Sequence, residues 1–89
     1  MVKQKISIKN PQGLHLRPAG NLCKEAVMYK SKITFQFRDI TANAKSVLSV
    51  LGACVQAEDE IELCCEGEDE KEALEALVQL ITSGLGEKE

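Results

Sequence analysis

Two kinds of hydrophobic spacing alternate along this chain of 89 residues, and their order limits the folds that it can adopt. Apolar residues at every second position are typical of half-buried strands, whereas a spacing of three or four is typical of amphipathic helices. Alternation predicts strands at residues 2–8, 33–37 and 60–66, and a short stretch at 40–44 could pair back on the second of them. Helical spacing predicts helices at 16–29 and 69–81, and residues 46–52, between a capping serine and a glycine, are expected to form a short helix. The expected element order is therefore β-α-β-β-α-β-α.

Residues that start or stop regular structure separate these segments. Residues 10–13, Asn-Pro-Gln-Gly, are a turn signal after the first strand. Ser46 is a favoured N-cap for the short second helix, and Asp69 with Glu72 has the spacing of a capping box at the start of the third. Gly84 is expected to end that helix.

This order folds readily as an α+β structure in which an antiparallel sheet carries the helices on one face. The length suits one domain, spanning residues 1–89. The second and third strands are expected to pair as a hairpin, although Arg38 and Asp39 make a weaker turn than Asn-Gly. Because the chain has no Trp, one Tyr and two Phe, its core is expected to be aliphatic. Periodicity alone does not predict the strand order.

Composition argues against several function classes. The formal net charge of −3 and the pI near 5.2 argue against direct nucleic-acid binding, which requires clustered Lys and Arg. No segment approaches the roughly 20 apolar residues of a membrane span, and the first ten residues lack the apolar run of a signal peptide. A cytoplasmic chain without membrane insertion, with protein or small-molecule partners, is expected.

The four cysteines have neither the spacing of a zinc site nor that of a disulfide framework. We expect Cys23, Cys54, Cys64 and Cys65 to be reduced and mostly buried, with no metal and no cofactor. Cys64 and Cys65 are neighbours on a predicted strand, so their side chains should point to opposite faces of the sheet.

The single histidine lies in the stretch GLHLRPAG, residues 13–20. Pro18 suits the first turn of a helix, which places His15 at the N-terminus of the first helix. Unpaired N–H groups and the helix dipole favour an anion there, and the guanidinium of Arg17 is suited to phosphate oxygens. At neutral pH an imidazole is mostly uncharged and has a nucleophilic nitrogen. These features indicate a histidine that carries a phosphoryl group.

Physical chemistry alone leaves a second interpretation open. A histidine near a helix start is more often a surface or capping residue, and Arg17 could pair with any of 14 acidic side chains. However, residues 13–19 closely resemble the G-[IL]-H-A-R-P-A motif of the HPr family, the histidine phosphocarriers of the bacterial sugar phosphotransferase system. Residues 43–46, Asn-Ala-Lys-Ser, resemble the second motif of that family, N-x-K-S. The resemblance covers essentially the whole chain.

The resemblance implies both a fold and a reaction. The family fold is an open-faced β-sandwich, a four-stranded antiparallel sheet of order 1-4-2-3 with three helices on one face. In the family, the histidine that matches His15 is phosphorylated on Nδ1 by enzyme I, using phosphoenolpyruvate, and passes the group to IIA components of sugar permeases. Arg17 would help to hold the phosphate. The protein would act as a monomeric carrier and not as an enzyme.

Ser46 has two interpretations, which are compatible. It is the expected helix cap. In HPr proteins of Gram-positive bacteria, the matching serine is also phosphorylated by HPr kinase/phosphorylase, and the product acts with a catabolite-control transcription factor. The resemblance therefore implies regulation at Ser46 and both of these partners.

The resemblance also implies a docking surface for partners, formed by Leu16, Gly20, Val47, Leu48 and Leu51. Leu16 and Gly20 both stand where the family usually has Ala.

Two alternative functions stay open. One is a purely regulatory HPr-like protein, although such proteins lack the histidine. The other is an acylphosphatase-like hydrolase whose loop would hold a substrate phosphate.

Overall fold

The structure is a computed structural model that describes residues 1–87. Its elements follow the predicted order: β1 (Val2–Ser7), α1 (Leu16–Ala26), β2 (Lys32–Phe37), β3 (Ile40–Asn43), α2 (Val47–Gly52), β4 (Glu60–Glu66) and α3 (Glu70–Thr82). The first helix ends at Ala26, whereas its spacing predicted an end near Tyr29. Val27 and Met28 are apolar but exposed, so the last part of that pattern does not pack on the core.

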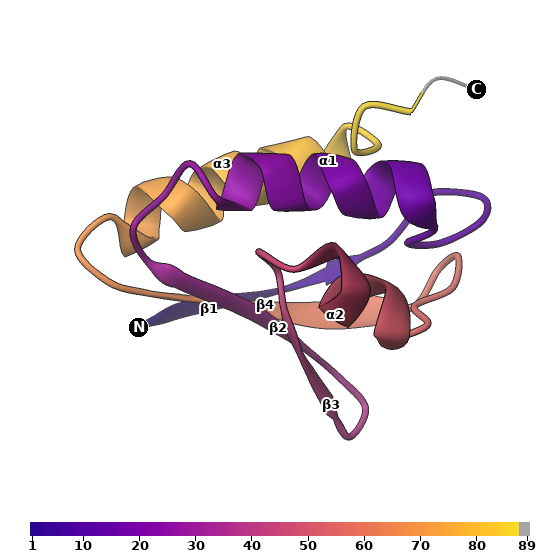
Figure 1. Ribbon diagram of the computed structural model, residues 1–89, viewed down its shortest axis with the longest axis horizontal. Helices are drawn as coiled ribbons and strands as arrows, with labels where there is room; N and C mark the ends of the chain where they lie inside the picture. Colours follow the sequence, from indigo (N-terminus) through magenta and orange to yellow (C-terminus); the bar gives the residue numbers. More distant parts are fainter. Residues whose placement is uncertain (88–89) are drawn as a thin grey trace.

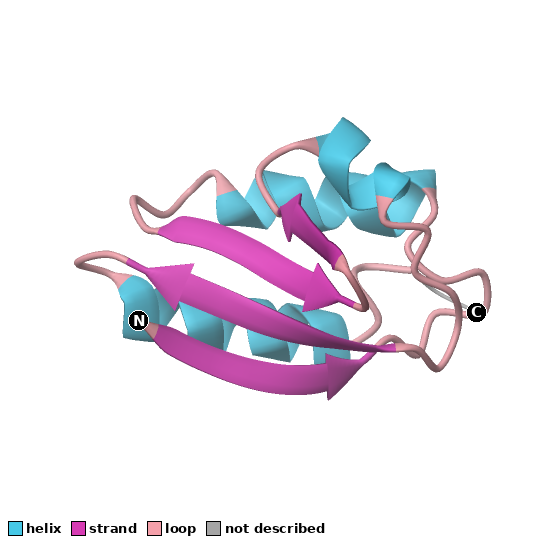
Figure 2. Ribbon diagram, turned by 90° about the horizontal axis from the view of Figure 1, so that it is seen from below, coloured by secondary structure: helices cyan, strands magenta, loops and turns pink. Residues whose placement is uncertain are grey.

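The four strands form one antiparallel sheet in the order β1-β4-β2-β3. Figure 1 shows α1 and α3 lying side by side across the sheet, and in Figure 2 the opposite face of the sheet carries no helix. The predicted hairpin is confirmed, because Phe37 pairs with Ile40. Its turn contains Arg38 at a φ of 56°, a left-handed conformation that a non-glycine residue seldom adopts. The predicted α+β class and the strand order of the open-faced sandwich are both confirmed.

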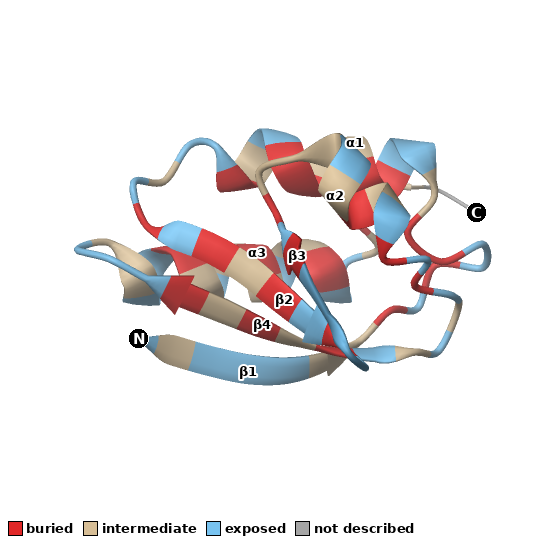
Figure 3. Cartoon of the chain, turned by 60° about the horizontal axis from the view of Figure 1, so that its bottom comes forward, coloured by how far each residue is buried: buried red, intermediate tan, exposed pale blue. Residues whose placement is uncertain are grey.

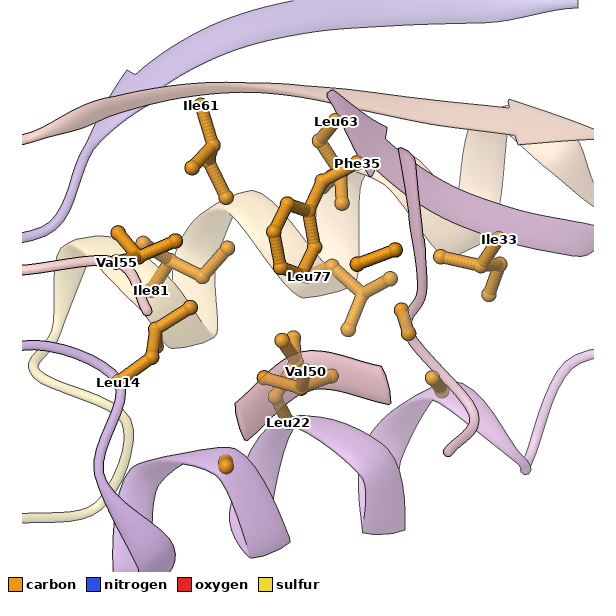
Figure 4. Close-up of a cluster of buried hydrophobic side chains, with 14 of the residues drawn as sticks. Leu14, Leu22, Ile33, Phe35, Val50, Val55, Ile61, Leu63, Leu77 and Ile81 are labelled. Atoms are coloured by element: carbon orange, nitrogen blue, oxygen red, sulfur yellow. The ribbon is translucent and has the colours of Figure 1, made fainter. Parts of the chain in front are cut away.

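The core lies between the sheet and the helices. Along β2, buried residues alternate with exposed or half-buried ones, which is the pattern of a strand with one covered face (Figure 3). Phe35 and Leu63 point from the sheet toward Leu22 of α1 and Leu77 of α3, and all four are fully buried (Figure 4). Apart from two Phe, the core side chains are aliphatic or small, as the composition predicted.

The predicted capping box at the start of α3 is wrong. Asp69 is the N-cap residue, but its side chain makes no capping hydrogen bond. Its carboxylate instead accepts hydrogen bonds from the N–H groups of Lys30 and Ser31 and from the Ser31 hydroxyl. Glu70 accepts the bond from Gly67 N–H, at 3.1 Å. The turn between α1 and β2 presents donors to the Asp69 carboxylate, and these contacts from a distant part of the chain replace the local cap.

The cysteines are buried only in part. Cys23 and Cys65 are buried, Cys64 is half-buried and Cys54 is exposed, so the prediction of mostly buried cysteines is wrong for Cys54. Cys54 follows α2 in a turn, at a φ of 55°, outside the core. Cys64 and Cys65 do lie on opposite faces of β4, and all four thiols are free. Burial raises the pKa of the Cys65 thiol to about 11.

None of the helices within residues 1–87 is long and apolar enough to cross a membrane.

Candidate functional site

A tight loop places the single histidine at the start of α1. Gly13 has a φ of 69°, and a Cβ there would overlap the carbonyl oxygen of Val55. The N–H of Gly13 donates to Asn10 O at 2.9 Å, and the N–H of Leu14 donates to Val55 O at 3.0 Å. The Leu14 side chain is buried in the core. The loop is thus fixed on both sides immediately before His15.

His15 is the N-cap residue of α1, as the sequence predicted. Its backbone is extended, at φ −80° and ψ −171°, and its side chain makes no capping hydrogen bond. The imidazole remains about one-third exposed (34%). Because His15 does not cap the helix, the N–H groups of the first turn are available to an anion placed beside the ring.

The neighbours of His15 on α1 divide into buried and exposed side chains. Pro18 is buried in the first turn, where a missing N–H costs no helical hydrogen bond. Leu16 is 68% exposed, and because the His15 ring keeps an exposed fraction of 34%, Leu16 does not cover it completely. Arg17 is exposed, and it makes no ion pair within residues 1–87. The guanidinium of Arg17, two residues after the imidazole in sequence, therefore has no ion-pair partner among the described residues.

Two further residues contact this site, and the sequence analysis missed both. Nε2 of His15 lies 2.9 Å from Oε2 of Glu87. The other oxygen of that carboxylate, Oε1, accepts a hydrogen bond of 2.7 Å from Nδ2 of Asn10. The only available signal was the pair of glycines in residues 84–86, which allows the chain to turn after α3. Within the described residues, Nδ1 of His15 makes no hydrogen bond.

The second predicted locus is the start of α2. The Ser46 hydroxyl accepts a hydrogen bond of 3.3 Å from the N–H of Ser49, which confirms Ser46 as the N-cap. The N–H of Ser46 donates to Asn43 O at 3.0 Å. Ser46 is half-buried, so its hydroxyl is only partly covered.

The five predicted docking residues lie on α1 and α2, which pack against each other. Leu48 is 82% exposed, and Val47 and Leu51 are half-buried against the core. A Cβ at Gly20 would meet no atom within 4 Å, so α1 presents bare backbone there. Two exposed leucines, Leu16 and Leu48, thus lie on adjoining helices.

No metal centre is evident in the described part of the chain, where no three His, Cys, Asp or Glu side chains are grouped to hold an ion. The chemistry available at His15 is that of an imidazole at a helix N-terminus, with the exposed Arg17 two residues further along the chain. This arrangement can accept and stabilise a phosphoryl group.

Comparison with known proteins identifies the family. The family profile described as "PTS HPr component phosphorylation site" matches residues 2–83. The chain belongs to the HPr family. It is 38% identical to the phosphocarrier protein HPr of Lysinibacillus sphaericus over 82 residues, which cover 92% of this chain and 93% of that protein. The crystal structure of HPr-C-His from Thermoanaerobacter tengcongensis superposes with a TM-score of 0.94, at 38% identity, over 100% of both chains.

Membership of the HPr family excludes one of the two alternative functions. HPr proteins are phosphocarriers of the phosphotransferase system and not enzymes, so the acylphosphatase-like hydrolase is wrong. The regulatory alternative has a similar relative in the HPr-like protein Crh of Bacillus subtilis, which is 35% identical over 91% of this chain and 95% of its own length.

Proposed function

We propose that His15 accepts a phosphoryl group from enzyme I, which takes it from phosphoenolpyruvate, and passes it to the IIA components of sugar permeases in the cytoplasm. The observation that carries this proposal is the position of His15, which is partly exposed at the uncapped N-terminus of α1. A regulatory relative without a histidine would have no use for that geometry. The protein acts as a monomeric covalent intermediate between donor and acceptor proteins.

The phosphoryl group is held by the helix and by Arg17. Its oxygens lie near the N–H groups of the first turn, whose dipole favours an anion. The guanidinium of Arg17 adds charge-assisted hydrogen bonds, and it has no competing ion pair in residues 1–87. Both the N–H groups and the guanidinium belong to the first turn of α1, immediately after His15.

The test is labelling with enzyme I and radioactive phosphoenolpyruvate. His15→Ala should abolish labelling and keep the fold, because the imidazole is a partly exposed group outside the core. Arg17→Ala should slow labelling by at least about tenfold, the size of a lost charge-assisted hydrogen bond. Labelling that survives in His15→Ala would show that another residue accepts the phosphate. A wild-type rate in Arg17→Ala would remove Arg17 from the mechanism.

Enzyme I and the IIA components are proposed to dock on Leu16, Gly20, Val47, Leu48 and Leu51. Large exposed apolar side chains close to a reactive group are typical of an interaction surface. Leu16 and Leu48 are 68% and 82% exposed, which supports this assignment.

Regulation at Ser46 by HPr kinase/phosphorylase, with a catabolite-control transcription factor as reader, is a second part of the proposal. The hydroxyl lies at the N-terminus of α2, where a phosphate meets N–H groups and a favourable dipole. The similarity to Crh, whose solved structure is titled as a catabolite repression HPr, favours this role.

A further inference from the structure

The chain that follows α3 returns to the start of α1. We call residues 83–87 the C-terminal tail; Figure 1 shows it in yellow beside the first turn of α1. Gly84 has a φ of 96°, which turns the chain, and Leu85 is fully buried. The carbonyl of Leu85 accepts a hydrogen bond of 2.7 Å from Nδ2 of Asn21, a residue of α1. The tail is therefore held by a side chain buried in the core and by a hydrogen bond to α1.

Asn10 fixes the last described residue of this tail. Asn10 is only 3% exposed, and its Nδ2 donates to Gly84 O at 2.9 Å as well as to Oε1 of Glu87 at 2.7 Å. The second oxygen of Glu87 is then directed at Nε2 of His15, 2.9 Å away. The Glu87 side chain is 19% exposed, so little water competes for these bonds. One carboxylate thus joins a buried amide to the reactive ring.

We propose that Glu87 is a positioning residue for His15, and this inference rests on the function proposed above. In the neutral ring only one nitrogen carries a proton. A carboxylate beside Nε2 accepts a hydrogen bond from an N–H group at that nitrogen. It therefore favours the tautomer in which Nε2 carries the proton and Nδ1 carries the lone pair. Glu87 therefore holds both the orientation of the ring and the tautomer in which Nδ1 is the nucleophile, as carboxylates do for histidines in other sites.

Phosphoryl transfer to His15 changes the charge of the ring, and the Glu87 carboxylate also compensates this change. When the Nδ1 lone pair forms a bond to phosphorus, the bond between phosphorus and the donor atom of enzyme I breaks, and its electron pair leaves with the donor. The proton on Nε2 stays, so the ring becomes cationic. Glu87 compensates this charge from the side opposite to the phosphate. In onward transfer the Nδ1–phosphorus bond breaks, the pair returns to Nδ1 and the same proton is still in place.

The first measurement needs no partner protein. Long-range ¹H–¹⁵N NMR of the unphosphorylated protein above neutral pH reports which ring nitrogen carries the proton. We expect the Nε2-protonated fraction to fall in Glu87→Ala relative to wild type, and to stay unchanged in the control Glu68→Ala. Glu68 is an exposed carboxylate paired with Lys30, away from His15. The same ring spectrum in wild type and Glu87→Ala would overturn the positioning role, whatever the fate of the carrier function.

The second measurement is the rate of phosphoryl transfer from enzyme I. In Glu87→Ala we expect kcat to fall by at least about tenfold, the size of a lost charge-assisted hydrogen bond, with KM within about twofold of wild type. Glu87→Gln should recover part of the rate, because its carbonyl still accepts from Nε2. Unchanged kcat in Glu87→Ala, or an effect confined to KM, would overturn the inference. If the wild-type protein were not labelled by enzyme I, or if His15→Ala were still labelled, the proposed function itself would be overturned.

Discussion

The carboxylate of Asp69 joins the start of α3 to the turn before β2, because it accepts a hydrogen bond from Ser31, which lies 38 residues earlier in the chain. It accepts hydrogen bonds from the Ser31 hydroxyl and from the N–H groups of Lys30 and Ser31. The bond from the Ser31 hydroxyl, followed by that from Lys30 N–H, holds the pKa of Asp69 below its usual value. All three donors favour the ionised form, so folding and ionisation of this group are coupled.

The sign of this coupling predicts acid sensitivity. Because the pKa of Asp69 is lower in the folded protein, its stabilising contribution is present above the unfolded value near 4. It is lost as the pH falls through the folded pKa. Asp69→Asn should therefore melt at a lower temperature at pH 7, and the difference from wild type should shrink as the pH falls from about 5 toward 2. Thermal melts over that range measure it. Glu68→Gln is the control, and a difference independent of pH would contradict the prediction.

At the scale of elements, α2 depends on its cap more than the longer helices do. It has only six residues, and a helix of that length has little stability of its own. Ser46→Ala removes the acceptor for Ser49 N–H and should cost about 0.5–2 kcal/mol of unfolding free energy. Ser46→Asp keeps an acceptor and adds a negative charge at a helix N-terminus, so it should melt at or above Ser46→Ala.

Phosphoryl transfer should rank these two variants in the opposite order. A negative charge at Ser46 lies at the start of the helix that carries Leu48, so on the proposed docking surface enzyme I would have to desolvate that charge. Ser46→Asp should therefore accept phosphate from enzyme I more slowly than Ser46→Ala, although it is no less stable. Equal rates, or a slow and unfolded Ser46→Asp, would leave Ser46 as a helix cap alone.

Elements were predictable from the sequence because their signals are local. The spacing of apolar residues, together with capping and turn residues, predicted all seven elements, and the Ser46 cap depends on a residue three positions away. Contacts between distant segments left no such signal. The carboxylate of Asp69 serves a turn that precedes it by 38 residues, and Glu87 meets His15 across 72 residues. The motif thus predicted the position of the imidazole but not the hydrogen bond between its Nε2 and Glu87.

At the scale of the whole molecule, the sheet separates the cysteines by exposure. β4 lies between β1 and β2, so Cys65 is covered by strands on both sides and by the core on its own face. Its pairing partners are Val2 and Ile33. Cys54 lies in the exposed turn after α2, outside the sheet. Access to Cys65 therefore requires the core between the sheet and the helices to open, whereas access to Cys54 does not.

Thiol reactivity measures this opening. Alkylation requires the thiolate, and burial raises the pKa of Cys65 to about 11, so the folded protein offers neither access nor the reactive form. Pulse alkylation followed by mass spectrometry should label Cys54 at the rate of a free thiol and Cys65 only through unfolding. As denaturant is added, the Cys65 rate should rise in parallel with the unfolding equilibrium, while the Cys54 rate should hardly change. Labelling of Cys65 as fast as Cys54 in the absence of denaturant would mean that the core over β4 opens without global unfolding.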